Sequence, residues 1–203
     1  MQKKCEIASG YNSALGGVQF NMASLNIATL GALHVTRDGT AVDGFAYNKV
    51  RALLIYLATD SARSHTRSEL CGLLWPELLD RAARRNLSQA LTTLRRALGD
   101  GSEPTPFVTI AGEAISIGPE VETDAGRFEA LLTECERHRH RSWQTCASCG
   151  ERLEAAMRLY RGDFLDRFFL ADSAPFEEWA LLWRERLRQR AFSALERLAQ
   201  RAE

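Results

Sequence analysis

The sequence lacks any long apolar run. The chain has 203 residues, 45% of them hydrophobic, but no stretch approaches the roughly 18–20 consecutive apolar residues that a membrane-spanning helix needs. Its first residues also lack the continuous apolar segment of a secretory signal peptide. These absences favour a cytoplasmic protein without a membrane partner. A regular pattern begins only at Leu25, so residues 1–24 are expected to be a disordered tail or an upstream mis-start, with Met22 as the alternative start.

The chain also lacks net charge, because 26 Lys and Arg residues balance 26 Asp and Glu residues. Binding to an acidic polymer would therefore have to come from a local patch, since the overall field offers no attraction. Residues 80–100 hold such a patch, in which the only acidic residues are Asp80 and Asp100. The arginines of this stretch are Arg81, Arg84, Arg85, Arg95 and Arg96.

Catalytic motifs are missing as well. The sequence has no Gly-rich phosphate loop and no recognisable pairing of a nucleophile with a general base. An enzyme that uses Cys146 and Cys149 is the least favoured class, and the sequence predicts a protein that is not an enzyme.

Residues 25–118 alternate between strand and helix patterns. The stretch LNIATLGALHVTRDGTAV predicts antiparallel strands over roughly 25–30 and 32–36, with a turn signal at Arg37-Asp38-Gly39. Helical spacing follows in YNKVRALLIYLATD and in SHTRSELCGLLWPE. In the second of these, Thr66 and Glu69 fit a capping box, and Pro76 ends the helix. The stretch PFVTIAGEAISIGP predicts another hairpin.

The arginine-rich stretch DRAARRNLSQALTTLRRALGDG predicts an amphipathic helix, with Asp80 as its N-cap and Gly99 just past its end. Its apolar stripe consists of Leu87, Leu91, Leu94 and Leu98. The opposite side, at about 100° per residue, carries Arg85, Gln89, Thr92 and Arg96, flanked by Ser88 and Thr93.

Beyond Glu120 the pattern is wholly helical. It predicts a helix capped near Thr123 or Asp124, a second that stops at Gly162, and a long third one over 175–201. Large and small residues alternate in them as in α-hairpin repeats of the tetratricopeptide kind. Residues 119–203 are thus expected to form a helical domain. We expect this domain to be incomplete, because the apolar face of its last helix still runs at the end of the chain.

These elements resemble a known pair of domains. The strands, RALLIYLA, TRSELCGLLWPE, RRNLSQALTTLRRALG and the hairpin after them resemble an OmpR/PhoB-type winged helix. Downstream, ETDAGRFEALL, LEAAMRLYRGDFLDRF and FEEWALLWRERLRQRAFSALERLA resemble the bacterial transcriptional activator domain that follows such a winged helix in SARP-type activators and some large ATPase regulators. The fold class implied is an α+β winged helix-turn-helix over 25–118, followed by an all-α, tetratricopeptide-like domain.

The resemblance implies a sequence-specific DNA-binding transcriptional regulator. Helix 81–98 would enter the major groove of double-stranded DNA, and residues 106–117 would form the wing. The helical domain would serve dimerisation or contact with RNA polymerase, and a homodimer would bind direct repeats. A second hypothesis remains open, in which the protein is an interaction adaptor with a degenerate winged helix.

The outward side of helix 81–98 supplies the candidate DNA contacts. Arg85 and Arg96 suit phosphate or guanine, and Gln89 suits adenine through its paired donor and acceptor. The remaining candidates are Ser88, Thr92 and Thr93 on the same helix, and Lys49 and Arg67 at the starts of two earlier helices.

Two further predictions concern the neighbours of this face. Arg84 and Arg95 lie nearer its buried edge, where contact with DNA backbone or a carboxylate is expected. The wing is expected to contribute little, because Glu113 at its tip would repel phosphate and no Lys or Arg lies between Glu103 and Gly118.

One cluster stands apart from this function. The stretch CERHRHRSWQTCASCGERL holds Cys135, His138, Cys146 and Cys149, with spacing that a tetrahedral zinc site can use. His140 competes with His138 as the histidine ligand. Two other interpretations stay open, a thiol switch of Cys146 with Cys149 and an ordinary polar loop. A structural zinc ion is the single cofactor that the sequence suggests.

Overall fold

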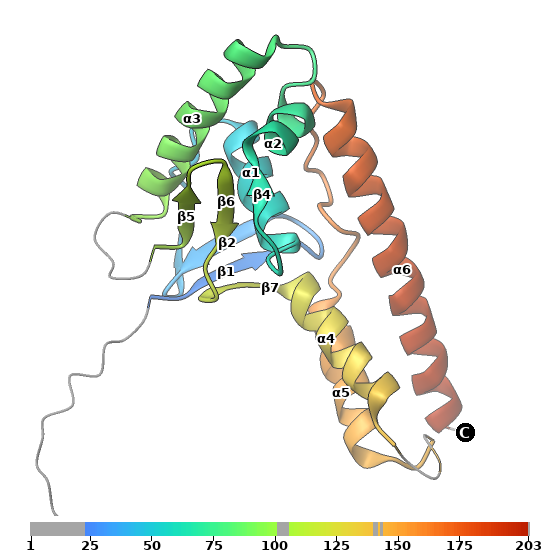
Figure 1. Ribbon diagram of the computed structural model, residues 1–203. Coiled ribbons are helices and arrows are strands. Elements are labelled where there is room, and N and C mark those ends of the chain that lie inside the picture. Colours follow the sequence, from blue (N-terminus) through green and yellow to red (C-terminus); the bar gives the residue numbers. More distant parts are fainter. Residues whose placement is uncertain (1–22, 101–105, 140–141, 143, 203) are drawn as a thin grey trace, which may run out of the picture.

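The computed structural model describes residues 23–100, 106–139, 142 and 144–202. Its first part contains β1 (Leu25–Ala28), β2 (His34–Arg37), β3 (Thr40–Ala41), α1 (Asn48–Thr59), β4 (His65–Thr66), α2 (Arg67–Leu74), α3 (Asp80–Ala97), β5 (Val108–Ala111) and β6 (Ala114–Ile117). After it come β7 (Val121–Thr123), α4 (Asp124–Arg137), α5 (Ala147–Leu159) and α6 (Ala174–Ala202). The layout is α+β followed by all-α, as the sequence predicted (Figure 1). None of the described helices is long and apolar enough to cross a membrane.

Two small sheets frame the first part. One has the strand order β3-β2-β1-β7 and the other the order β4-β6-β5. The predicted first hairpin is formed, with Leu25 opposite Arg37. The bounds of its strands differ from the predicted ones, because β1 ends earlier than expected and β2 begins and ends later. The turn signal joins β2 to a third strand that was not predicted. Asp38 and Gly39 both have positive φ, 51° and 79°, which is the two-residue turn that matches strand twist.

The ends of the helices correct two predictions. The Thr66 hydroxyl accepts from the Glu69 amide at 3.1 Å, but the Glu69 carboxylate turns to Arg63, His65 and Tyr56, so the capping box is half formed. Asp80 does not cap α3, whose N-cap is Leu79. Asp80 lies in the first turn, where its charge still favours the helix dipole.

The other end of α3 forms as predicted. Gly99 has φ 67°, and its amide donates to the Arg96 carbonyl at 3.1 Å while the Asp100 amide donates to the Arg95 carbonyl at 2.8 Å. This pair of hydrogen bonds is the Schellman arrangement, which a residue without a Cβ adopts at low cost. It ends α3 sharply. The next described strands, β5 and β6, pair as the antiparallel hairpin that the sequence predicted, and this hairpin over residues 106–117 is called the wing after the expectation for it.

The two parts are packed together. Strand β7 follows the expected boundary at 118/119, yet it pairs in parallel with β1. Oδ1 of Asp124 then accepts from the Thr29 amide at 2.6 Å, and Trp179 of α6 packs edge-on against Tyr56 of α1, with 5.0 Å between ring centroids. The helical part is therefore fixed to the sheet and to α1.

In the helical part, α4 and α5 lie side by side and α6 runs along the molecule (Figure 1). The Thr123 hydroxyl caps α4 by accepting from the Gly126 amide at 2.9 Å. Helix α5 ends at Leu159, before the predicted stop at Gly162. The apolar face of α6 points inward, and its residues are buried or half-buried: Phe176, Trp179, Trp183, Leu187, Ala191, Ala194 and Leu198.

Candidate nucleic-acid interface

Helix α3 presents the predicted polar face to solvent at one edge of the molecule (Figure 1). Its apolar stripe is buried, with Leu87, Leu91, Leu94 and Leu98 all at 1% exposure or less. On the opposite side the exposed residues are Arg85, Ser88, Gln89, Thr92 and Arg96, while Thr93 is half-buried. The local periodicity thus placed this face correctly, and its use for DNA stays a prediction.

Three side chains of this face are uncommitted, which means that they make no hydrogen bond or ion pair with the described part of the chain. Within the described residues, those of Arg85, Gln89 and Arg96 have no hydrogen-bond or ion-pair partner. The two hydroxyl groups differ, because that of Ser88 donates to the Arg84 carbonyl at 2.9 Å and that of Thr92 donates to the Ser88 carbonyl at 3.0 Å. Two guanidinium groups and one amide are therefore held on a rigid helix and point to water.

The neighbouring arginines, Arg84 and Arg95, are paired with carboxylates, which is one of the two alternatives that the sequence left open for them. Arg84 lies 3.1 Å from Asp80 and 3.0 Å from Glu113, and the hydrogen bond that it donates to Glu113 is the largest cause of its raised pKa. Arg95 Nε lies 3.4 Å from the fully buried Asp100. Because Asp100 Oδ2 also accepts from the Val108 amide at 3.1 Å, this carboxylate joins the end of α3 to the first strand of the wing.

The wing tip is fastened to two helices. Arg67 at the start of α2 donates from Nε to the Gly112 carbonyl at 3.1 Å and from Nη1 to the Ser88 hydroxyl at 3.3 Å. Its amide donates to the Glu113 carbonyl at 3.0 Å. The sequence suggested that the Glu113 carboxylate at the tip repels phosphate. In the structure Arg84 offsets the charge of this carboxylate.

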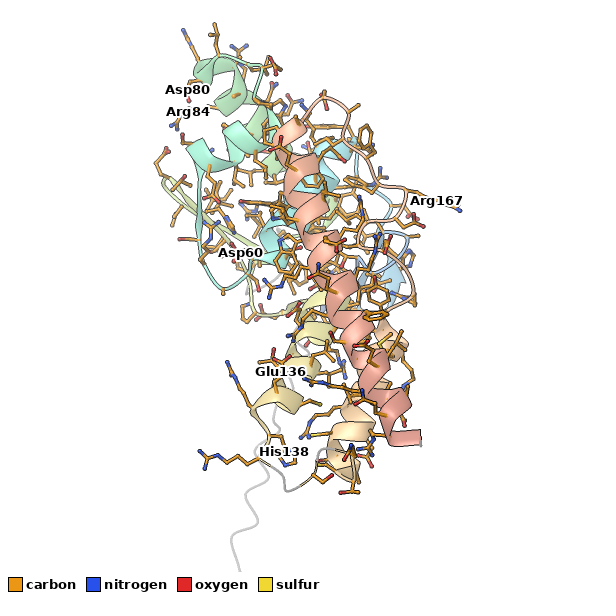
Figure 2. All side chains as sticks on the ribbon, turned by 90° about the vertical axis from the view of Figure 1, so that its right-hand side faces the viewer. Asp60, Asp80, Arg84, Glu136, His138 and Arg167 are labelled. Carbon is orange, nitrogen blue, oxygen red and sulfur yellow. The ribbon has the colours of Figure 1, made fainter. Side chains whose placement is uncertain are left out.

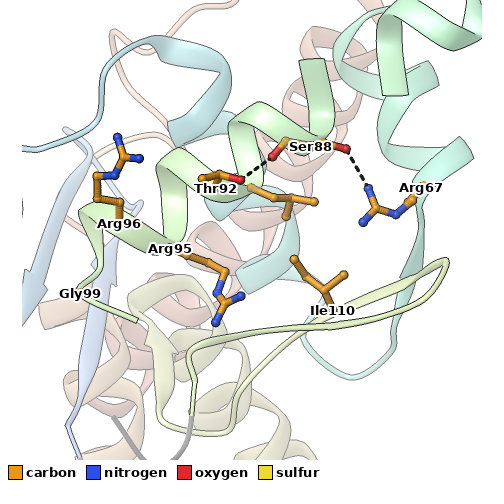
Figure 3. Close-up of a pocket in the computed structure, with 8 residues that line it drawn as sticks. Arg67, Ser88, Thr92, Arg95, Arg96, Gly99 and Ile110 are labelled. Atoms are coloured by element: carbon orange, nitrogen blue, oxygen red, sulfur yellow. Dashed lines mark hydrogen bonds between the residues drawn. The ribbon is translucent and has the colours of Figure 1, made fainter. Parts of the chain in front are cut away.

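Between α3 and the wing lies a groove of about 620 Å³. Figure 3 shows that Arg67 reaches it from the side of Ser88, while Arg95 and Arg96 at the other end of α3 point in opposite directions. The other residues that line it are Ser88, Leu91, Thr92, Gly99 and Ile110. Sequence reasoning missed this groove, because Arg67 and the wing meet only through the fold. Arginines at both ends of a groove with apolar residues between them suit an extended anionic chain.

Lys49 does not join the predicted contact residues around the groove. Its Nζ lies 2.8 Å from an Asp172 carboxylate oxygen and 5.4 Å from the centre of the Trp75 ring, and its side chain is 13% exposed. Lys49 instead lines a separate cavity with Asn86, on the other flank of α3. No local signal reveals this, because Asp172 is far away in the sequence.

The cysteine and histidine cluster lies elsewhere. His138 follows α4, Cys146 is the N-cap of α5, and Cys149 is in the first turn of α5. The thiols of Cys146 and Cys149 and a ring nitrogen of His138 lie within 4.8 Å of one another. Cys135 is buried in α4 beside them, and His140 falls outside the described residues.

Comparisons with known proteins identify relatives of this arrangement. No protein-family model matches the sequence. The chain is 34% identical, over 152 aligned positions, to the transcriptional regulatory protein EmbR of Mycobacterium tuberculosis and to that of Mycobacterium bovis. Each match covers 70% of this chain and 36% of the relative. The chain therefore spans about a third of the length of the curated relatives it matches.

A solved structure agrees with the sequence match. It is described as Mycobacterium tuberculosis EmbR in complex with low affinity phosphopeptide, and it superposes with a TM-score of 0.63 at 27% identity. The superposition covers 85% of this chain and 44% of the other. Over most of its own length, the chain is thus similar in sequence and fold to part of a transcriptional regulatory protein.

Proposed function

We propose that the protein is a sequence-specific, DNA-binding transcriptional regulator of the SARP type. Residues 25–118 act as a winged helix of the OmpR/PhoB kind, and α3 is the recognition helix. The observation that carries the proposal is the exposed, uncommitted set of Arg85, Gln89 and Arg96 on one side of α3. Similarity to a transcriptional regulatory protein supports the same function and a non-enzymatic role.

The geometry suggests how a duplex is bound. An α-helix fits the major groove, where Arg reads guanine and Gln reads adenine through paired hydrogen bonds. Arg85 and Gln89 are one turn apart on α3 and reach adjacent base edges. The sugar-phosphate backbone beside the major groove then runs along the groove between α3 and the wing, where Arg67, whose guanidinium group donates to a carbonyl and a hydroxyl rather than to a carboxylate, meets its charge.

The contribution of the wing is small in this arrangement. Its described residues, 106–117, include no lysine or arginine, and Glu113 at the tip is held by Arg84. The helical, tetratricopeptide-like part supplies the remaining affinity by bringing two copies onto direct repeats, or by contacting RNA polymerase. Lys49, paired with Asp172, holds the two parts of the chain together and contacts no phosphate.

The test starts from a random-sequence duplex library, because the target sequence is unidentified. Purified chain is used to enrich bound duplexes, and the affinity for the enriched duplex is then measured at several salt concentrations. We expect the double variant Arg85→Ala, Arg96→Ala to bind at least about 30-fold more weakly, since each lost guanine contact costs about 1–3 kcal/mol. A lost phosphate contact would instead lower the salt slope by about 1.

A matched control uses arginines that lie on another helix. Arg186→Ala with Arg188→Ala removes two exposed arginines from α6, and we expect the affinity of this variant for a single-site duplex to be unchanged. If no duplex sequence is enriched, or if both double variants bind DNA equally, the proposal is wrong. The adaptor hypothesis would then explain the chain better.

A further inference from the structure

The cysteine and histidine cluster has the shape of a metal site. His138 Nδ1 lies 3.1 Å from Cys149 Sγ and 3.5 Å from Cys146 Sγ, and all three atoms are within 4.8 Å of one another. Zinc bonds of about 2.0–2.3 Å in a tetrahedron separate neighbouring ligand atoms by about 3.3–3.8 Å. The two distances from the histidine nitrogen to the sulfur atoms are close to this spacing, and the two sulfur atoms lie within 4.8 Å of each other.

The local backbone explains why these side chains converge. Helix α5 begins after Cys146, so this residue and Cys149 occupy the N-cap and the third position of one helical turn. The Gly150 amide donates to the Cys146 carbonyl at 3.1 Å, which closes that turn. His138 is the first residue past α4, and its ring reaches across to both thiols.

A fourth donor lies one turn before His138. Cys135 is 5% exposed in α4, and its thiol donates to the Cys149 carbonyl at 3.6 Å. It stands three residues before His138, in the last turn of α4. It is not part of the close group of three, so it would have to rotate towards the metal when the ion binds.

The surroundings suit a charged thiolate centre. Arg201 of α6 donates from Nη1 to the Cys146 carbonyl at 2.9 Å, which brings a positive charge and the end of α6 to the site. Gly150 leaves room for this contact, since a Cβ there would stand 2.5 Å from the Arg201 guanidinium. Three helices thus meet at one small group of metal-binding atoms.

We propose that Cys135, His138, Cys146 and Cys149 bind a structural zinc ion that joins α4 to α5. Sulfur and imidazole ligands select zinc over magnesium and calcium. The site lies at the other end of the molecule from the start of α3, as the positions of His138 and Arg84 show (Figure 2). Its role is therefore mechanical, and it is independent of the proposed DNA contacts.

The experiment measures metal in the full chain, purified under reducing conditions without chelator. We expect one zinc per chain, and, after exchange, a cobalt spectrum with the d–d bands of tetrahedral thiolate coordination. Removal of the metal by a chelator should lower the thermal unfolding midpoint, and added zinc should restore it.

Single variants assign the ligands. Cys146→Ser and His138→Gln, both at solvent-accessible positions, should lose stoichiometric metal, and Cys135→Ser should bind it more weakly. The matched control is Cys71→Ser, which removes a buried thiol in α2 and should keep one metal per chain. Because the cobalt spectrum of the unaltered chain needs no variant, a variant that fails to fold leaves the test intact.

The proposal is wrong if the reduced chain binds neither zinc nor cobalt stoichiometrically, or if Cys146→Ser binds metal as tightly as the unaltered chain. A Cys146–Cys149 disulfide that forms reversibly in a metal-free chain would replace it with the thiol-switch interpretation.

Discussion

Helices α3 and α6 are both rich in arginine, but their arginines meet different surroundings. On α3, Arg85 and Arg96 face solvent without a partner in the described residues. On α6, each arginine of one run meets an acceptor on a neighbouring element: Arg184 the Phe164 carbonyl, Arg186 Glu129, Arg188 Asp163 and Arg190 Glu136. Arginine content alone therefore does not separate arginines that stabilise the fold from arginines that are available to a ligand, whereas the presence of a partner does.

The pairing on α6 also has a structural consequence. Its partners lie on α4 and in the segment between α5 and α6, so the arginines hold the long helix against the rest of the helical part. Exposed ion pairs contribute little individually. Arg190 is expected to contribute more to stability than the other arginines of α6, because its side chain is only 24% exposed and that of its partner Glu129 is 16% exposed.

The largest effect on stability is expected at an ion pair outside α3 and α6, between Arg63 and Glu69. Glu69 of α2 accepts from Arg63, His65 and Tyr56, and these hydrogen bonds, that from Arg63 first, lower its pKa from 4.5 to about 2. The folded state then binds the proton less tightly than the unfolded state does. The stabilising effect of the hydrogen bonds to the ionised Glu69 carboxylate is fully present above about pH 4.5 and is lost as the pH falls towards 2.

We therefore expect Glu69→Gln to lower the free energy of unfolding at pH 7 by about 1–3 kcal/mol. The difference between variant and unaltered chain should shrink between pH 4.5 and 2. Urea unfolding at a series of pH values measures both. The exposed Glu122 of β7 offers a control, Glu122→Gln, and a loss of the same size in the control would show that the Glu69 contacts are not responsible.

The next effect compares the two helices directly. Arg190→Met keeps the aliphatic stem but leaves Glu129 and Glu136 without this partner, so we expect a loss of about 1–2 kcal/mol in unfolding free energy. Arg96→Ala on α3 should change it by no more than about 0.5 kcal/mol. Urea unfolding without DNA measures both variants. Equal losses would mean that Arg96 also stabilises the fold, and the contrast between the helices would not hold.

The sequence predicted what depends on local spacing. The apolar stripe of α3, its exposed face and the ending at Gly99 all follow from periodicity and one glycine. Pairings between distant segments could not be predicted, among them β7 with β1, Lys49 with Asp172 and the groove between α3 and the wing. Each depends on how elements pack. Arg84 is an intermediate case, because its place on the helix predicted a carboxylate or backbone partner but not which one.

The smallest effect concerns the wing. Glu113→Gln removes the one acidic group at the wing tip and releases Arg84 from a 3.0 Å ion pair. An exposed pair of this kind adds little stability, so the unfolding midpoint should hardly change.

On DNA, however, the variant has one fewer charge that repels phosphate and one more arginine available to bind it. We expect affinity for the enriched duplex to rise by a few-fold, with a salt slope steeper by up to about 1. Unchanged affinity and slope would place the wing tip away from the duplex, and α3 would then account for recognition alone.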